Sequence, residues 1–440
     1  MGAVFTRDIH HRYPTAMKAE GMYIYDDEGK TYLDMCGGAA VSCLGHGHPD
    51  VLAALHQQLN NLAFAHTSFF TNAPQEKLAM MISERFGEPD ARVYFTSGGS
   101  EANETAIKVA WQYWRALGQK GKSKIISRRH SYHGNTYGAL SVSGNPVRRR
   151  SVGDVLMDWP RISPCYAYRN QRDDESAAEY GVRVANELEA AILQAGADSV
   201  AAFIAEPVSG ASLGAVPPAP GYFKRIREIC DRYNVLLIAD EVMCGTGRTG
   251  TFFAHAQEAI VPDIVTLAKG IGGGYQALAA TVVRRKIVEV FETNTGFDHG
   301  HTYVGHATSC TAGVAVLEAI EKYQLLGVVN SMEEQLHQAI LDAVNDCAYV
   351  GDVRGRGFFH AIEFVADKVT KKPHENGVVL AKKLKTVAMR HGLMVYPSGG
   401  NAKEDIGCHI LIAPPFVTKS RHIEELNDKL KATVNEVFGD

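Results

Sequence analysis

The stretch DIVTLAKGIGGG, residues 263–274, places a single lysine, Lys269, between a short apolar run and a cluster of glycines. Residues 264–267 are apolar or β-branched, so they predict a buried strand, and the glycines predict a turn after it. An ammonium group at the end of a buried strand is costly unless it is solvated or loses its charge. A lysine in a desolvated site has a lowered pKa and becomes a nucleophile toward carbonyl groups. The alternative is a lysine whose stem packs while its head reaches solvent.

Four other runs share this pattern of an apolar strand followed by turn residues and a helical segment. The five expected strands are residues 93–95, 124–127, 201–205, 235–239 and 264–267. Apolar strands that alternate with helices are typical of a mostly parallel sheet covered on both faces, so the sequence predicts an α/β protein. The helix in SEANETAIKVAWQYWRALG is expected to start with Ser100 as its N-cap and to end at Gly118.

The last third of the chain, from about residue 330, mixes short strands with helices, which predicts a smaller lobe. The N-terminal segment, with the hairpin signal YIYDDEGKTYLD at residues 23–34, is expected to join this lobe. We therefore divide the chain into the N-terminal part of a small domain, a large ligand-binding domain and the C-terminal part of the small domain. The expected bounds are 1–60, 61–330 and 331–440.

The composition is that of an ordinary globular protein. Of the 440 residues 45% are hydrophobic, and the formal net charge is −4. This balance favours neither nucleic acid nor an anionic membrane as a partner, and no apolar run is long enough to cross a membrane. The eight cysteines include no C-x-x-C pair and the N-terminus lacks an apolar signal region, which favours the reducing cytosol. We expect a cytoplasmic protein whose partners are small molecules and other protein chains.

Residues that directly follow strands are the candidates for a ligand site, because open α/β sheets bind ligands beyond the carboxyl ends of their strands. In TSGGSEA, residues 96–102, two glycines and Ser100 stand where a strand becomes a helix, so amide groups there could cradle a phosphate. A plain capped turn is the alternative. Asp240 ends the apolar strand VLLIAD, where a carboxylate needs a cation or strong donors unless it is only a cap or turn residue. The other candidates are Tyr132, His133 and Glu206.

Three of these features together match the needs of one cofactor, pyridoxal phosphate. The cradle at Gly99 and Ser100 would anchor the phosphate. Asp240 would keep the pyridine nitrogen protonated, and Lys269 would hold the aldehyde as a Schiff base. Each feature alone has a simpler explanation, but their equivalent positions in one sheet favour a common site.

A dinucleotide site is a weaker interpretation. GTGRTG, residues 245–250, matches G-x-G-x-x-G, but its glycines begin several residues after the strand and no clear helix opens on them. The acidic residue that the fingerprint requires about 20 positions further on is missing as well.

A metal site is also disfavoured. The histidines at residues 46–48 and 299–306 do not have H-E-x-x-H spacing, and no cysteine or acidic residue stands at ligand spacing beside them. We therefore expect structural histidines and no metal.

The motifs as a set resemble those of the class III aminotransferases, the ω-amino acid and amine transaminases among the fold type I pyridoxal phosphate enzymes. The resemblance runs from YLDMCGGAAVSCLGHGHP through TSGGSEANETAIKVA, SYHGNTYGALSVSG, ADEVMCGTGRTG and LAKGIGGGY to HTYVGHATSCTAG and APPF. It implies a large domain with a mostly parallel seven-stranded sheet that binds pyridoxal 5′-phosphate. A smaller α+β domain is then expected from both termini.

The resemblance also assigns roles to residues around the cofactor. Lys269 would form the internal aldimine and, once freed, shuttle a proton, while Asp240 would pair with the pyridinium nitrogen. Gly99 and Ser100 would bind the phosphate. The other implied contacts are Tyr132 and Val242 on the two faces of the ring, Glu206 in the hydrogen-bond network, and His133.

Thr302, in HTYVGH, matches a threonine that in this family reaches the phosphate of the neighbouring subunit's cofactor. This implies a homodimer with active sites at the interface. The implied reaction moves an amino group from a primary amine or ω-amino compound to a keto acid, with pyruvate expected, in ping-pong order. A decarboxylating transaminase and an aminomutase share the fold and the motifs and remain alternatives.

Departures from the family pattern bear on the substrate. Asn135 stands where the ornithine and γ-aminobutyrate branches carry an arginine, which disfavours those substrates. No arginine lies between Arg390 and Arg421, where amine transaminases place one before the small lobe's PP, so the second carboxylate of 2-oxoglutarate lacks an evident partner. Lys403 is the nearest cation but cannot make the same planar contact. The expected substrate-pocket residues are Ala40, Phe69, Tyr132 and Lys403, with Arg354 and Arg356 as further carboxylate binders.

Overall fold

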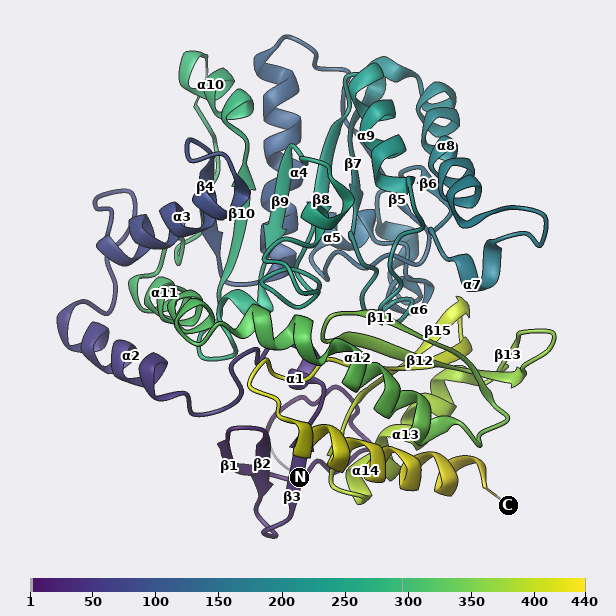
Figure 1. Ribbon diagram of the computed structural model, residues 1–440. Helices are drawn as coiled ribbons and strands as arrows, with labels where there is room; N and C mark the ends of the chain where they lie inside the picture. The colour runs from purple at the N-terminus through teal and green to yellow at the C-terminus, as the bar shows by residue number, and fades with distance from the viewer. Residues whose placement is uncertain (1–2, 295, 440) are drawn as a thin grey trace.

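In the computed structural model, which describes residues 3–294 and 296–439, helices surround three β-sheets (Figure 1). The strands of the largest sheet are, in spatial order, β4 (Arg92–Thr96), β10 (Ala279–Val283), β9 (Ile264–Leu267), β8 (Leu236–Asp240), β7 (Val200–Ala205), β5 (Lys124–Arg128) and β6 (Arg161–Ile162). β10 is antiparallel to both of its neighbours, whereas every pair from β9 to β6 is parallel. The predicted seven-stranded, mostly parallel sheet is confirmed.

Helices cover both faces of this sheet. They are α4 (Gly99–Ala116) and α10 (Arg285–Thr293) on one face, and α8 (Ala177–Ala195) and α9 (Tyr222–Arg232) on the other. Successive residues of a strand point to opposite faces. Accordingly, Phe203 and Leu237 pack toward α8 and α9, whereas Ile204 and Ile238 pack toward α4. Because both faces are covered, the central strands β7 and β8 are apolar up to their ends, and the polar residue that ends β8 stands out.

Two smaller sheets combine the two ends of the chain (Figure 1). One holds β11 (Val350–Arg356), β12 (Phe359–Asp367), β16 (Ile406–Ile412) and β15 (Tyr396–Lys403), with β13 (Lys372–Pro373) paired to β12. The other holds β1 (Ala16–Glu20), β2 (Tyr23–Asp26), β3 (Thr31–Asp34) and β14 (Leu393–Met394). The β2–β3 hairpin occurs as expected, and β3 runs parallel to β14, so the N-terminal segment joins the C-terminal third.

Three helices pack on the small sheets: α12 (Leu325–Val344), α13 (Gly377–Arg390) and α14 (Ser420–Phe438). α12 runs across residue 330, where the sequence suggests a boundary, so the exact division into domains stays a prediction. The remaining helices are α1 (Gly37–Ala40), α2 (Pro49–Asn61), α3 (Ala73–Phe86), α5 (Tyr137–Val142), α6 (Pro146–Arg149), α7 (Ala167–Asn170) and α11 (Ala307–Lys322). Short 3₁₀ helices are η1 (Gly153–Val155), η2 (Ala197–Ser199), η3 (Ala254–Glu258) and η4 (Lys269–Ile271).

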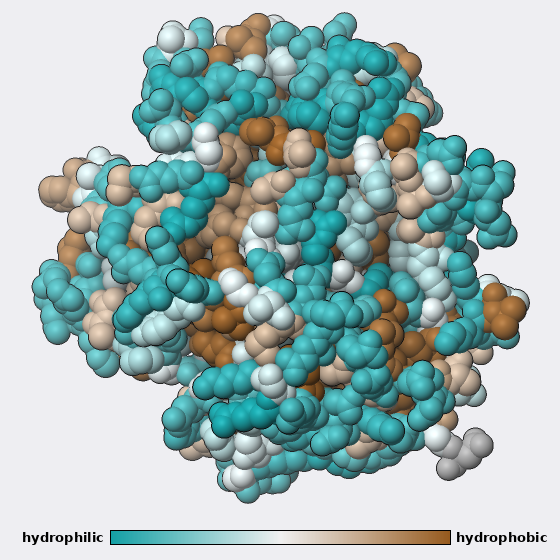
Figure 2. All heavy atoms as spheres, in the orientation of Figure 1, coloured by the Kyte–Doolittle hydropathy of each residue, from teal (hydrophilic) through white to brown (hydrophobic). Residues whose placement is uncertain are grey.

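The surface seen in Figure 2 is mainly hydrophilic, with hydrophobic side chains gathered in the recesses between its protruding parts. None of the helices in the described part of the chain is both long enough and apolar enough to cross a lipid bilayer.

The start of α4 differs from the sequence prediction. Its N-cap is Gly98, in an extended conformation, and not Ser100, which lies inside the first turn. The Ser100 hydroxyl instead accepts a hydrogen bond from the Asn135 amide at 3.0 Å. The Glu101 carboxylate stabilises the turn that precedes α4, because it accepts hydrogen bonds from the amide and the hydroxyl of Ser97. The prediction was wrong because a distant loop occupies the serine that local rules assign to capping.

Candidate active site

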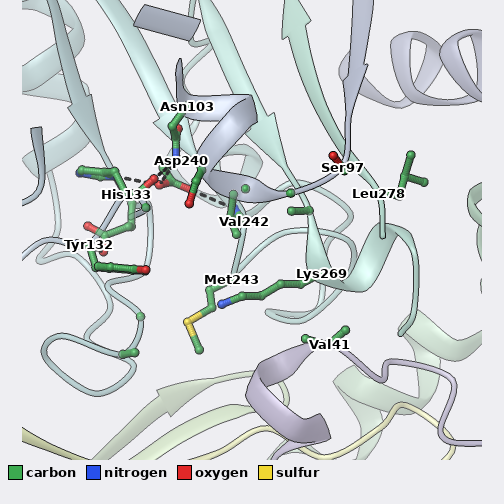
Figure 3. A pocket seen from close by; sticks show the side chains of 18 of the residues that line it. Val41, Ser97, Asn103, Tyr132, His133, Asp240, Val242, Met243, Lys269 and Leu278 are labelled. Carbon is green, nitrogen blue, oxygen red and sulfur yellow. Dashed lines mark hydrogen bonds and ion pairs between the residues drawn. The ribbon is translucent and has the colours of Figure 1, made fainter. Parts of the chain in front are cut away.

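A cavity of about 320 Å³ opens beyond the carboxyl ends of β5, β7, β8 and β9 (Figure 3). Its lining includes eight of the residues that the sequence nominates. They are Gly99, Ser100, Tyr132, His133, Glu206, Asp240, Val242 and Lys269. These residues come from segments that lie far apart in the sequence, and the parallel strand order brings them to one edge of the sheet.

The amine of Lys269 points into this cavity (Figure 3). Among the residues described, no group forms a hydrogen bond or ion pair with its Nζ. Burial lowers the pKa of Lys269 from 10.5 to about 8, although the negative charge of Asp240 opposes part of this shift. The backbone of Lys269 has a positive φ of 50°, an uncommon conformation for a residue with a side chain and one that clusters at functional sites. The chain therefore holds a reactive amine at the end of β9.

The glycines after Lys269 allow the chain to turn back tightly. A Cβ atom at Gly272 would lie 2.5 Å from the carbonyl oxygen of Gln276, closer than any side chain permits. Gly273 and Gly274 have positive φ values of 57° and 84°. Glycine adopts this conformation without strain, so this segment can follow η4 without filling the cavity.

Asp240 is buried at the end of β8 and is held by three donors. Its Oδ2 accepts from Nδ1 of His133 at 2.7 Å and from Nδ2 of Asn103 at 2.9 Å. Its Oδ1 accepts from the amide of Val242 at 3.0 Å. An ionised carboxylate only accepts hydrogen bonds, so Nδ1 of His133 carries the proton. Strong donors thus compensate the buried charge, and they fix the direction in which the carboxylate points.

The N-terminus of α4 forms a small concave surface beside Asp240. A Cβ atom at Gly99 would lie 2.8 Å from the side chain of Val242, so only glycine fits there. A Cβ atom at Gly134 would lie 2.7 Å from the Ser100 hydroxyl, and Gly134 has a φ of 140°. No side chain caps the first turn of α4. Its free amides and the Ser100 hydroxyl therefore suit an anionic group such as phosphate.

Glu206 connects the cavity lining to strand β5 and to the backbone of Tyr132. It forms a buried ion pair with Arg128 at 3.0 Å and accepts from the amide of Tyr132 at 3.3 Å. Burial raises the pKa of the Tyr132 hydroxyl above its usual value. Glu206 thus positions the backbone beneath the Tyr132 ring, whereas the ring itself faces the cavity.

The pKa of Lys269 predicts how the amine reacts in the ligand-free protein. The neutral fraction of an amine rises about tenfold per pH unit below its pKa and levels off above it. Labelling of Lys269 by formaldehyde and cyanoborohydride should reach half of its maximal rate at about pH 8, whereas ordinary surface lysines, with pKa values near about 10.4, should still accelerate. Peptide mass spectrometry across a pH series measures both rates. Equal midpoints for Lys269 and the surface lysines would contradict the effect of burial.

Four other nominated residues do not line this cavity: Ala40, Phe69, Thr302 and Lys403. Ala40 is buried behind Val41, which takes its place in the lining. Phe69 is 79% exposed and Thr302 is also on the surface, so a role for either in a second subunit's site stays a prediction. Lys403 is exposed near the turn of the β15–β16 hairpin, where it pairs with Ile406.

The two other arginines suggested as carboxylate binders have partners within the protein. Arg354 pairs with Asp352 at 2.7 Å and Glu363 at 2.8 Å, and Arg356 donates to Glu258 at 2.9 Å. They hold the five-stranded sheet against the large domain and do not face the cavity.

Sequence reasoning missed several residues of the lining. The most important is Asn103, one turn after Gly99 in α4, whose amide bonds to Asp240. The spacing of four residues on one helix face is the signal that could have identified it. The others include Val41, Ser97, Ala211, Met243, Gln276 and Leu278, which lie in loops whose direction cannot be predicted from the local sequence.

The structure offers no support for the two rival sites. Residues 245–250 form turns that pack against α12, since a Cβ atom at Gly247 would lie 2.3 Å from Leu326. Across residues 3–294 and 296–439, no three His, Cys, Asp or Glu side chains come together as a metal ion would require.

Comparisons with known proteins agree with this geometry. The sequence profile described as aminotransferase class-III matches residues 5–434. An uncharacterised aminotransferase of Schizosaccharomyces pombe is 40% identical over 98% of this chain and 94% of its own length. The chloroplastic gamma aminobutyrate transaminase 3 of Solanum lycopersicum is 35% identical over 96% of this chain and 81% of its own length. Among solved structures, a PLP-bound amine transaminase from an uncultivated Pseudomonas species has a TM-score of 0.91 at 34% identity, covering 99% of this chain and 98% of that one.

Proposed function

The chain belongs to the class III aminotransferases, and we propose that it moves the amino group of a primary amine or ω-amino compound to a keto acid, with pyruvate preferred. Its cofactor is pyridoxal 5′-phosphate, as in its structural relatives. One observation carries the proposal: an unpaired amine with a lowered pKa, a donor-bound carboxylate and an uncapped helix N-terminus line a single cavity.

The residues present fit this cofactor. The amides of Gly99 and Ser100, with the Ser100 hydroxyl, would hold its phosphate, and Asp240 would hold its protonated ring nitrogen. Val242 and Tyr132 offer an apolar and an aromatic surface for the two faces of the ring. When bound, the cofactor supplies an aldehyde that condenses with amines and a ring that withdraws electrons from the reacting carbon.

The protein's own groups would supply binding, orientation and proton transfer. Neutral Lys269 has a free electron pair, so it can first react as a nucleophile and later accept and return a proton at its Nζ. Asp240 cannot rotate away, because His133, Asn103 and the backbone of Val242 fix both of its oxygens. Glu206 holds Tyr132 in place through the backbone.

The proposal extends to assembly and kinetics. We propose a cytoplasmic homodimer in which Thr302 reaches the partner's phosphate site, and ping-pong kinetics, since one cofactor serves both half-reactions. A decarboxylating transaminase or an aminomutase would use the same residues. The absence of arginine from the cavity lining favours pyruvate over 2-oxoglutarate, whose second carboxylate would have no guanidinium partner there.

A panel of amine donors with pyruvate or 2-oxoglutarate tests the function. The enzyme loaded with pyridoxal phosphate should transfer nitrogen from a ¹⁵N-labelled primary amine to pyruvate, with parallel lines in double-reciprocal plots. Alanine formation followed by mass spectrometry measures the transfer. Release of carbon dioxide, migration of the amine within one molecule, or a clear preference for 2-oxoglutarate would each contradict part of the proposal.

A further inference from the structure

The cavity has no group in its lining that could pair with a substrate carboxylate through two parallel hydrogen bonds. Among the residues described, the lining contains Lys269 and no arginine. Lys269 takes part in the reaction itself, so it cannot also hold an acid group throughout turnover. A substrate that carries a carboxylate must find its cation at the rim.

Most arginines that could serve are already held by the protein. Ion pairs hold Arg128 to Glu206, Arg354 to Asp352 and Glu363, and Arg356 to Glu258. Arg248 donates hydrogen bonds to the carbonyl groups of Phe358 and Pro414. Releasing any of them to a substrate would leave a buried acceptor or charge without its partner.

Three consecutive arginines stand at residues 148–150, and two of them are also held by the protein. Arg149 donates to three carbonyl oxygens at the end of α5. Arg150 pairs with Asp405 of the β15–β16 hairpin. In the described part of the chain, the Arg148 side chain has no hydrogen bond and no ion pair. Its guanidinium carbon lies 5.8 Å from the centre of the Tyr132 ring, and Tyr132 lines the cavity.

The charges around Tyr132 also favour an anion at this side of the cavity. Arg148 is the strongest charged group opposing the burial that raises the pKa of Tyr132, and Arg7 acts in the same direction. The carboxylate that acts on this hydroxyl is Asp240, which His133 and Asn103 already hold. Two guanidinium groups thus act on this side of the cavity, and positive charge there attracts anionic substrates.

We propose that Arg148 is a specificity-determining residue that binds the carboxylate of an ω-amino acid donor while the donor's amine lies at Lys269. This proposal rests on the proposed transaminase function. A guanidinium held against an aromatic ring keeps its N–H groups free for a bidentate contact with a carboxylate. Because Arg148 stands outside the lining, a carboxylate next to the reacting carbon lies too deep for it. A carboxylate at the far end of an alkyl chain longer than the two methylenes of 2-oxoglutarate reaches the rim.

Steady-state kinetics with pyruvate and two donor series tests the assignment. The donors are ω-amino acids from β-alanine to 6-aminohexanoate and n-alkylamines of matching length, and the variants are R148Q, R148K and the matched control R150Q. For the best ω-amino acid, R148Q should raise KM by about 10- to 100-fold with little change in kcat, because one charge-assisted bidentate contact is lost. KM for the n-alkylamine should change by less than about twofold, and R150Q should behave as wild type, since exposed ion pairs contribute little.

The possible outcomes distinguish the role of Arg148 from the proposed transaminase function. R148K should fall between R148Q and wild type, since it keeps the charge and loses the planar contact. An R148Q enzyme that retains its KM for every ω-amino acid, or that loses amino acids and alkylamines equally, would overturn the role of Arg148. A wild-type enzyme that transaminates no donor would instead refute the proposed function. Thermal unfolding should differ little among the variants, because within the described residues the Arg148 side chain has only its contact with the Tyr132 ring to lose, and the exposed Arg150–Asp405 ion pair contributes little.

Discussion

Replacing Lys269 by alanine is expected to lower kcat for transamination by about 10⁴-fold or more, because the variant loses both its nucleophile and its proton carrier. Alanine keeps the Cβ atom at the strained position, so the backbone of η4 is unchanged. The phosphate cradle and Asp240 also remain, so the variant should still bind pyridoxal phosphate. It should no longer become covalently labelled when the enzyme is treated with borohydride. Activity assays and intact-protein mass spectrometry measure the two effects.

Two comparisons identify the chemical reason for this loss. Lys269→Arg keeps a positive charge but offers no amine that is neutral near pH 8, so it should be as inactive as the alanine variant. Added methylamine should restore part of the activity of Lys269→Ala, since a small amine can enter the space left by the side chain. The cofactor-free alanine variant should melt no lower than wild type, because burial disfavours the charged lysine in the folded state. A variant that retains more than about one hundredth of the activity would exclude Lys269 from this role.

The sheet and the candidate site at its carboxyl edge could be predicted because polar residues stand at the ends of apolar strands. β8 and β9 are covered on both faces, so Asp240 and Lys269 stand out against the residues before them. The α/β pattern predicts parallel strands, and the carboxyl ends of parallel strands meet at one edge of the sheet. This is why eight of the nominated residues line one cavity.

The residues that the sequence misplaced depend on contacts between distant segments. Ser100 follows the rule for an N-cap, yet the Asn135 loop occupies its hydroxyl. Lys403 was chosen for its position along the chain, but it lies exposed near the turn of the β15–β16 hairpin and does not line the cavity. Asn103 was missed because a polar residue inside a helix has many possible partners, and only the fold shows that Asp240 is the one. Arg148, the proposed carboxylate partner, belongs to the four-residue helix α6, whose placement depends on the loops on either side.

Replacing Asp240 by asparagine should reduce kcat by about 10²- to 10³-fold, the usual cost of removing one preorganised electrostatic group from an active site. A neutral amide cannot stabilise a protonated ring nitrogen as a carboxylate does. The amide also fits its surroundings badly. If its oxygen keeps the bonds to His133 and Asn103, its NH₂ group faces the amide hydrogen of Val242, and two donors oppose each other. The variant should therefore also release pyridoxal phosphate faster during dialysis.

Asp263→Asn is the matched control for this substitution. Asp263 is 1% exposed and pairs with Arg227 at 2.8 Å, but it lies at the opposite end of the sheet, directly before β9. Its loss should destabilise the fold by roughly 3–5 kcal/mol, because the buried carboxylate pairs with both Arg227 and Lys286, and Arg227 would keep only its pair with Asp231. The fraction that remains folded should nevertheless retain normal kcat and cofactor binding. If Asp240→Asn likewise lowers only stability, leaving kcat within about tenfold of wild type, Asp240 serves the sheet and not the cofactor.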